Sequence, residues 1–334
     1  MIRVLYSLLG LVIFGCGNPT QTADSINVSS EDSIADKLQP ELIVSEIPIN
    51  LEKAKQKIED NKTKLNNITG DFREFKTFTQ SLSKFDLYTI STTADYLRAF
   101  LPKANQADKD STYLYFLRTF YRTVNNLTDS LSIKFPETMK KMEEGKEDIQ
   151  TKNFEEYLSL FGTGLFMTEG MFYLDVEPDY FLGIFDKHVS NGLNAYLIQR
   201  RQELMEGFSE DAGLTISFDQ VYDRVLKWEQ IVSENPNFLM ANDSQQYYET
   251  YLETLLTGMD NSRVFDFEDE RLIPDVKKLY ESIIKSGPNT KSTEIIKGYY
   301  NLLADNDFKY SDKVDDYLKK NGLSSMLGIQ PHSR

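Results

Sequence analysis

The sequence predicts an all-α fold, built as a multi-helix bundle or an irregular superhelical array of about ten helices. From Leu51 onward, apolar residues recur with a period near 3.6, which is the period of an amphipathic helix. Capping residues and Gly or Pro stops divide this pattern into separate segments. Two runs, 214–217 and 264–267, alternate between apolar and polar residues, but four residues are too few to predict a strand.

The first helices of the body are delimited by a capping pattern and a proline. Asp71 and Glu74 have the spacing of a capping box, in which two side chains satisfy two amide groups at a helix start. A helix is therefore predicted to open at Asp71. The next segment covers 86–101 and is predicted to stop at Pro102, because proline cannot continue a helix.

The middle of the chain carries two further predicted helices outside its central apolar stretch. One begins at residue 111 or 112 and is ended or kinked by Pro136. The other begins at Pro178, in a position that suits the first turn of a helix, and runs to about Met205. Gly207 is expected to close it, because glycine is the common residue just beyond a helix end.

The last third is predicted to hold five helices. Ser217 and Gln220 form a second capping box. Ser244 is expected to open a tyrosine-rich helix that ends before Gly258, and Pro274 opens a helix that stops at 287–288. The two final helices are predicted at 295–303 and 314–318.

The stretch 157–174 is the most apolar run after the N-terminus, and Asn153 with Glu156 is expected to cap it. Because it is apolar on all sides, it is predicted to be a buried helix. Its three glycines are Gly162, Gly164 and Gly170. Each costs a helix up to about 1 kcal/mol relative to Ala. Either the glycines let neighbouring helices pack closely, or a break at 162–164 opens a pocket.

Glu169 is the only charged residue of this central stretch. In a helix it shares an inward stripe with Leu165 and Phe172, so its carboxylate needs a partner or its pKa rises. It is the candidate ligand-binding or acid–base residue of the chain. The alternative is a structural pair with an Arg or Tyr of a neighbouring helix.

No catalytic residue set, metal site or cofactor is predicted elsewhere. His188 is a lone histidine within a predicted helix, and neither GxSxG nor HExxH occurs. Acidic loops at 175–179 and 260–270 could supply oxygen ligands to Ca²⁺, but neither matches an EF-hand, and solvated loop acids are the alternative. A single Cys excludes an intramolecular disulfide.

The N-terminus has the layout of a bacterial signal peptide. Arg3 supplies the positive charge, and the apolar run 4–14 is shorter than the roughly 20 residues that span a bilayer. The run ends in Ile-Phe-Gly-Cys at 13–16, which resembles the lipobox of bacterial lipoproteins. The resemblance implies cleavage before Cys16, a diacylglycerol thioether on its sulfur and an acyl chain such as palmitate on its amine. The alternative is an ordinary signal peptide with an incidental Cys.

The resemblance also implies a location and a division of the chain. The protein is expected in the cell envelope, held by membrane lipid through acylated Cys16, and Gly17 favours the outer membrane in a cell that has one. The predicted parts are the cleaved signal peptide 1–15, the lipidated Cys and flexible tether 16–50, the helical domain 51–322 and a loose tail 323–334. Apolar residues late in the tether are expected to dock on the domain: Leu42, Ile43, Val44, Ile47 and Ile49.

Composition restricts the function classes. The formal net charge of −15 repels nucleic acid, so no nucleic-acid partner is expected. The expected function is that of an envelope lipoprotein whose helical domain binds an envelope protein or a small ligand. The alternative is a carboxylate-dependent envelope hydrolase that uses Glu169 or the acidic loops.

Overall fold

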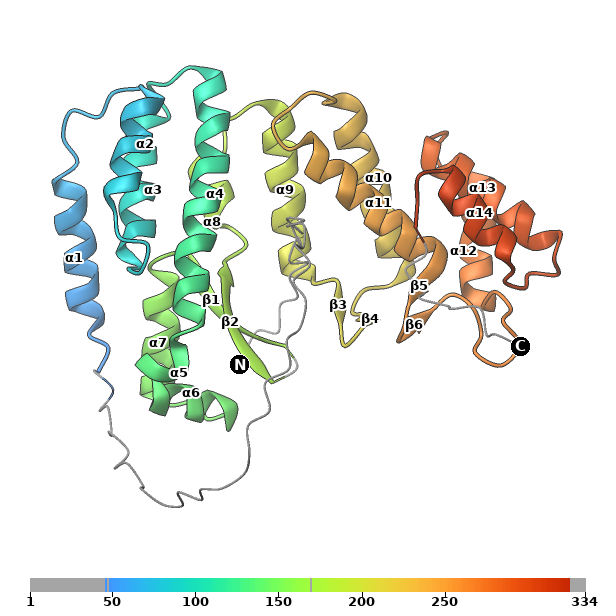
Figure 1. The fold of residues 1–334 in the computed structure, drawn as a ribbon, viewed down its shortest axis with the longest axis horizontal. Coiled ribbons are helices and arrows are strands. Elements are labelled where there is room, and N and C mark those ends of the chain that lie inside the picture. The colour runs from blue at the N-terminus through green and yellow to red at the C-terminus, as the bar shows by residue number, and fades with distance from the viewer. Residues whose placement is uncertain (1–45, 47, 169, 325–334) are drawn as a thin grey trace, which may run out of the picture.

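The computed structural model of the protein describes residues 46, 48–168 and 170–324. These residues form fourteen helices and three two-stranded antiparallel sheets, which confirms the predicted all-α class. The helices stand in a row from α1 at one end to α12–α14 at the other, broadly in chain order, with α5, α6 and α7 below α3 and α4 (Figure 1). Within this part of the chain, no helix is both long enough and apolar enough to cross a membrane.

The first eight helices and two strands make up the N-terminal half of the row. The helices are α1 (Leu51–Thr63), α2 (Phe72–Ser81), α3 (Tyr88–Phe100), α4 (Gln106–Thr128), α5 (Leu131–Lys134), α6 (Pro136–Glu143), α7 (Ile149–Ser159) and α8 (Tyr180–Phe185). The strands are β1 (Thr163–Thr168) and β2 (Met171–Val176).

The remaining elements form the C-terminal half. The helices are α9 (Asn191–Glu206), α10 (Phe218–Glu234), α11 (Ala241–Thr257), α12 (Pro274–Ser286), α13 (Lys291–Ala304) and α14 (Asp312–Lys320). The strands are β3 (Ser209–Glu210), β4 (Gly213–Leu214), β5 (Gly258–Met259) and β6 (Ser262–Arg263). Buried apolar side chains of the described residues form one connected core from Ile68 to Leu323.

Several predicted boundaries are confirmed because they depend on local capping chemistry. Asp71 accepts a hydrogen bond from the Arg73 amide at 2.7 Å and starts α2. Ser217 and Gln220 form the predicted capping box of α10. Gly207 ends α9 with φ +76°, a left-handed value that suits glycine.

The prediction of a buried helix over 157–174 is wrong. Helix α7 ends at Ser159, and β1 and β2 then pair as an antiparallel hairpin with Leu165 opposite Leu174. Gly162 explains the change, because its φ is +66° and a Cβ there would lie 1.9 Å from the ring of Tyr180. The chain therefore breaks at Gly162 and continues as a hairpin. The predicted close packing of helices against the glycines is wrong, and the break at 162–164, which was predicted to open a pocket, leads into this hairpin.

Other boundaries also differ from the prediction. Asn153 lies inside α7, whose capping box is built instead by Asp148 and Thr151. The helix predicted from Pro178 to Met205 is two helices, α8 and α9, and His188 lies in the turn between them. Helix α4 begins at Gln106, five or six residues before the predicted start, because the Asn105 side chain accepts from the Asp108 amide at 3.0 Å.

A helix–glycine–hairpin–helix unit occurs three times, which the sequence analysis did not predict. Gly162, Gly207 and Gly258 each have φ between +66° and +76° and each leads from a helix into a hairpin. All three hairpins lie on the same side of the row of helices, the lower side in Figure 1. Two of the hairpins have strands of two residues each, too short to leave a period-2 pattern.

The turns of the second and third hairpins are joined by hydrogen bonds. The Asn261 amide donates to the Ala212 carbonyl at 2.9 Å, and the Leu214 amide donates to the Ser262 hydroxyl at 2.8 Å. Ala212 holds a left-handed φ of +53°, which an alanine adopts only at a cost of about 1–2 kcal/mol. The contact between the hairpins therefore ties the α9–α10 unit to the α11–α12 unit.

The chain is attached to the domain just before α1. The carboxylate of Glu46 accepts from the Glu137 and Thr138 amides and from the Gln150 side chain, each at 3.0 Å, and also from the Thr138 hydroxyl. We call Glu137, Thr138 and Gln150 the Glu46 seat. Ile49 packs on the core as predicted, whereas the other four apolar tether residues lie outside the described residues.

Candidate functional site

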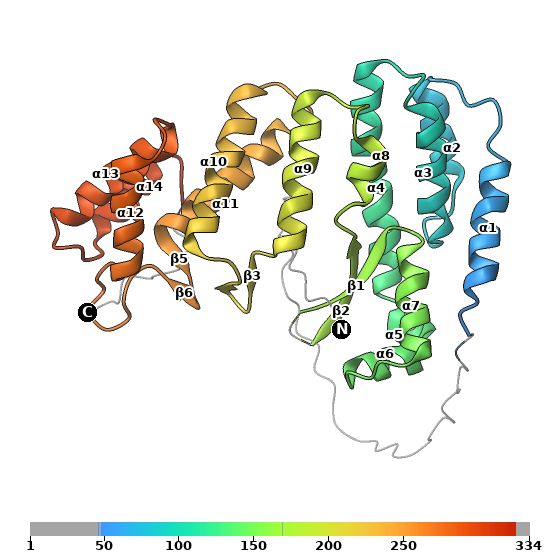
Figure 2. The same ribbon diagram turned by 180° about the vertical axis from the view of Figure 1, so that it is seen from behind.

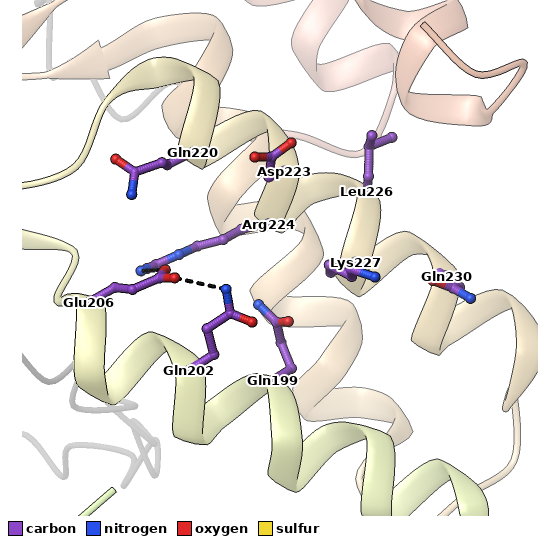
Figure 3. Close-up of a pocket in the computed structure, with 9 residues that line it drawn as sticks. All are labelled: Gln199, Gln202, Glu206, Gln220, Asp223, Arg224, Leu226, Lys227 and Gln230. Carbon is purple, nitrogen blue, oxygen red and sulfur yellow. Dashed lines mark hydrogen bonds and ion pairs between the residues drawn. The ribbon is translucent and has the colours of Figure 1, made fainter.

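The candidate site is a groove between α9 and α10 with a cavity volume of about 350 Å³ (Figure 3). Its lining consists of Gln199, Gln202, Glu206, Gln220, Asp223, Arg224, Leu226, Lys227 and Gln230. The first three residues come from α9 and the others from α10. They recur every three or four positions, so each helix presents one face to the groove.

The groove lining is polar and balanced in charge. Four of its nine residues are glutamines, whose amides both donate and accept hydrogen bonds. Two acids, Glu206 and Asp223, are matched by two cations, Arg224 and Lys227. The groove therefore offers many hydrogen-bonding groups without strongly favouring an anionic or a cationic ligand.

Arg224 forms the inner wall of the groove and is almost fully buried, with 3% exposure. Its Nη2 donates to Glu206 Oε2 at 3.0 Å and to the Gly207 carbonyl at 2.6 Å, and its Nη1 donates to Tyr251 Oη at 3.2 Å. Its Nε is buried and has no hydrogen-bond partner among the described residues. The guanidinium lies 5.4 Å from the ring centroid of Tyr251, within the range of a cation–π contact.

Glu203 is the centre of a buried polar network beneath the groove and is 3% exposed. It accepts from Trp228 Nε1 at 2.5 Å, from Gln199 Nε2 at 2.9 Å and from Arg200 Nη1 at 2.6 Å. The Trp228 ring stacks on Tyr247 with centroids 4.8 Å apart, and Arg200 lies 4.5 Å from the Tyr247 centroid. The groove residue Gln199 is therefore linked through Glu203 to the single tryptophan of the chain.

Arg200 of this network and Tyr251 beside Arg224 each keep one protonation state near neutral pH. Burial lowers the pKa of the Arg200 guanidinium, but its neighbours Tyr247 and Glu203 more than offset this, and the pKa lies well above its usual value. Burial raises the pKa of Tyr251 far above that of an ordinary tyrosine. Arg200 therefore stays charged and Tyr251 stays a neutral hydroxyl, so neither group supplies a base for catalysis.

A second hollow lies where the start of α2 meets the start of α4. It has a volume of about 720 Å³ and is lined by Gly70, Asp71, Phe72, Arg73, Lys103, Asn105 and Asp108. The Asp71 and Asn105 side chains already accept from the amides of these two helix starts. The hollow is therefore a less suitable ligand site than the groove between α9 and α10.

The described structure does not test the two site residues predicted from the sequence. Cys16 and Glu169 both lie outside the described residues. The acids of the two predicted loops already have protein partners: Asp175, which lies in β2, accepts from Tyr121 Oη of α4 at 3.0 Å, and Asp266 accepts from the Glu268 amide at 2.8 Å. Within residues 46, 48–168 and 170–324, no group of three or more His, Cys, Asp or Glu is placed to hold a metal ion.

The groove was missed because its signal is weak in the sequence. Gln199 and Gln202, like Gln220 and Gln230, have helical spacing, but glutamines on a helix also occur as an ordinary solvated face. Trp228, the single tryptophan of the chain, lies on the buried face of α10 and is fully buried. A stronger signal is the charge of Arg224 between Val221 and Val225 on a buried face.

Comparison of the chain with models of protein families, with curated proteins and with solved structures finds no match. The groove, the network beneath it and the N-terminal sequence are therefore the observations on which a function can be proposed.

Proposed function

We propose that this protein is a lipid-anchored binding protein of the bacterial cell envelope, and that its helical domain binds an extended protein segment in the groove between α9 and α10. The observation that carries the proposal is the groove lining of four glutamines, two acids and two cations. The location rests on the signal sequence and on the lipobox-like residues that end at Cys16, the only Cys of the chain.

A glutamine-lined groove suits a peptide backbone. A primary amide presents one carbonyl acceptor and an NH₂ donor, the same pair of groups as a peptide unit. Gln199 donates to Glu203 at 2.9 Å. Gln202 donates to Glu206 at 2.7 Å (Figure 3). Because these side chains are already ordered, binding loses less side-chain entropy than it would with mobile glutamines. The groove lining contains no aromatic ring that could stack on a sugar.

The hydrolase alternative stays a prediction. Its candidate, Glu169, lies outside the described residues. Of the two carboxylates in the groove, Glu206 is paired with Arg224 at 3.0 Å and accepts from Gln202, so it already serves a structural role.

The binding proposal can be tested with the chain's own tryptophan. Random hexapeptides without Trp are selected by phage display on the mature protein in detergent, and the selected peptides are synthesised. Each peptide is then titrated while Trp228 fluorescence is recorded, because Trp228 is linked to the groove through Glu203. We expect saturable fluorescence changes with the parent protein.

The matched variants are Gln202→Ala with Gln230→Ala in the groove, and Gln245→Ala on α11 outside it. Two lost hydrogen bonds at about 1 kcal/mol each weaken Kd about 30-fold, whereas Gln245→Ala leaves Kd unchanged. If no peptide is selected, or if the groove double variant binds as tightly as the parent, the proposal fails.

The anchor has a separate test. Cells that express the protein are grown with labelled palmitate, and incorporation is compared between the parent and the Cys16→Ser variant. We expect the label in the parent alone. Equal labelling of both proteins would exclude acylation at Cys16.

A further inference from the structure

The point at which the chain joins the domain is defined by the Glu46 seat. Four hydrogen bonds hold the Glu46 carboxylate against Glu137, Thr138 and Gln150, and Thr138 is fully buried. The seat joins the first turn of α6 to the first turn of α7. The chain therefore reaches the domain at the end formed by α5, α6 and the start of α7.

Exposed apolar side chains are found at this same end. Ile133 in α5 is 69% exposed, Ile149 at the first position of α7 is 74% exposed, and Met171 beside the β1–β2 turn is 64% exposed. Figures 1 and 2 both show α5, α6 and the turn of this hairpin at the lower end of the N-terminal half. Ile149 directly precedes Gln150 of the Glu46 seat.

The charge of this end differs from that of the whole chain. Residues 131–152 contain five lysines and five acids and are neutral, whereas the chain has a formal net charge of −15. An anionic lipid surface therefore repels this end less than the rest of the molecule. Lysines beside exposed apolar side chains are also the combination by which proteins contact a lipid interface.

We propose that the end formed by α5, α6 and the start of α7 rests on the membrane surface, with Ile133, Ile149 and Met171 in contact with the lipid headgroup region. The proposal rests on the proposed anchor at Cys16. Twenty-nine residues separate Cys16 from Glu46, and a chain of linker composition and this length has an r.m.s. reach of roughly 27–32 Å. The anchor thus keeps the Glu46 seat close to the bilayer, and the exposed apolar residues beside the seat meet it first.

The opposite end of the helices gives a control position. The connection between α10 and α11 lies at the upper side in both views, away from the hairpins (Figures 1 and 2). It contains Leu239, which is 40% exposed and apolar like the test residues. Because Cys16 is the only Cys of the chain and its sulfur is alkylated in the proposed lipoprotein, an introduced Cys is the only reactive thiol.

The experiment uses the acylated full-length mature protein in vesicles of phosphatidylethanolamine and phosphatidylglycerol. The variants Ile133→Cys, Ile149→Cys and Leu239→Cys are labelled with the fluorophore NBD, and quenching by lipids that carry a nitroxide near the headgroup is measured. We expect a loss of NBD emission and a blue shift at positions 133 and 149, with no change at 239.

The outcomes separate this inference from the anchor. Protein that floats with the vesicles but is quenched equally at all three positions, or at none, overturns the proposed membrane-facing end and leaves the anchor intact. Protein that does not float with the vesicles overturns the anchor itself, and the membrane-facing end with it. Quenching confined to positions 133 and 149 supports the proposal.

Discussion

Replacement of Glu203 by Ala tests whether the buried network beneath the groove stabilises the domain. The change removes the carboxylate that accepts hydrogen bonds from Arg200, Trp228 and Gln199. Arg200 stays charged, because a guanidinium is not deprotonated in proteins, so the variant leaves a cation largely buried without its partner. The side chains of Gln199 and Trp228 each lose an acceptor as well.

The expected loss is large for one residue. Breaking a buried ion pair by removing one partner costs about 3–5 kcal/mol. Because 16% of the Arg200 side chain reaches water, the lower half of that range applies. With an m-value of about 3 kcal/mol/M, the urea midpoint falls by about 1 M.

Urea unfolding followed by Trp228 fluorescence measures both the stability and the network, since the indole donates directly to Glu203. Glu203→Gln keeps the shape and an acceptor but removes the charge, so its midpoint is expected between those of Glu203→Ala and the parent. The control is Arg201→Ala, which removes an exposed pair with Asp179 and leaves the midpoint unchanged. If Glu203→Ala unfolds at the same urea concentration as the parent, the network does not stabilise the fold.

The remaining predictions concern the Glu46 seat and the packing of α9. Burial raises the pKa of Glu46, but hydrogen bonds from Thr138, Gln150 and the Glu137 amide offset this and lower it below its usual 4.5. The stabilisation by Glu46 is therefore present above pH 4.5 and lost as the pH falls through the lowered pKa. When urea midpoints are measured from pH 7 to 3, the midpoint of Glu46→Gln should fall less steeply towards low pH than that of the parent. Equal slopes for the two proteins would contradict this. Gly192→Ala places a Cβ 2.8 Å from Phe238 Cγ and should lower the free energy of unfolding by about 1–3 kcal/mol. The control is Gly183→Ala in α8, where no atom lies within 4 Å of the added Cβ, so the free energy of unfolding should rise by about 0.5–1 kcal/mol. Thermal melts in which both variants are more stable, or both less stable, than the parent would refute the packing argument.

Helix ends could be predicted from the sequence wherever one or two residues determine them. Three such ends depend on hydrogen bonds and backbone angles within a single turn, and they lie at Ser217 with Gln220, at Gly207 and at Pro274. Residues that are distant in the sequence therefore have little influence on where these helices begin or end. The central stretch failed for the opposite reason. An apolar run of this length has the same composition in a buried helix as in a hairpin packed on α4 and α7. What distinguishes the two is the backbone, because Gly162 and Gly170 adopt positive φ values and Tyr180 occupies the space that a Cβ at Gly162 would need.

The groove could not be predicted because it exists only between helices. Gln202 and Gln230 resemble any exposed polar residue until α9 is placed beside α10. Glu203 and Arg224 are charged residues that sequence patterns assign to the surface, yet each is only 3% exposed. Their burial becomes favourable through partners on other elements, such as Trp228 for Glu203 and Tyr251 for Arg224, and those pairings follow from tertiary packing.

The row of helix–glycine–hairpin–helix units has a consequence for how the protein folds. Most elements pack on their neighbours in the chain: β1 on β2, α10 on α11, α12 on α13 and α13 on α14. Contacts between neighbouring elements close only short loops, which costs little entropy. Each unit can form as soon as its own residues are available, and a chain that emerges N-terminus first can fold progressively without waiting for its C-terminal end.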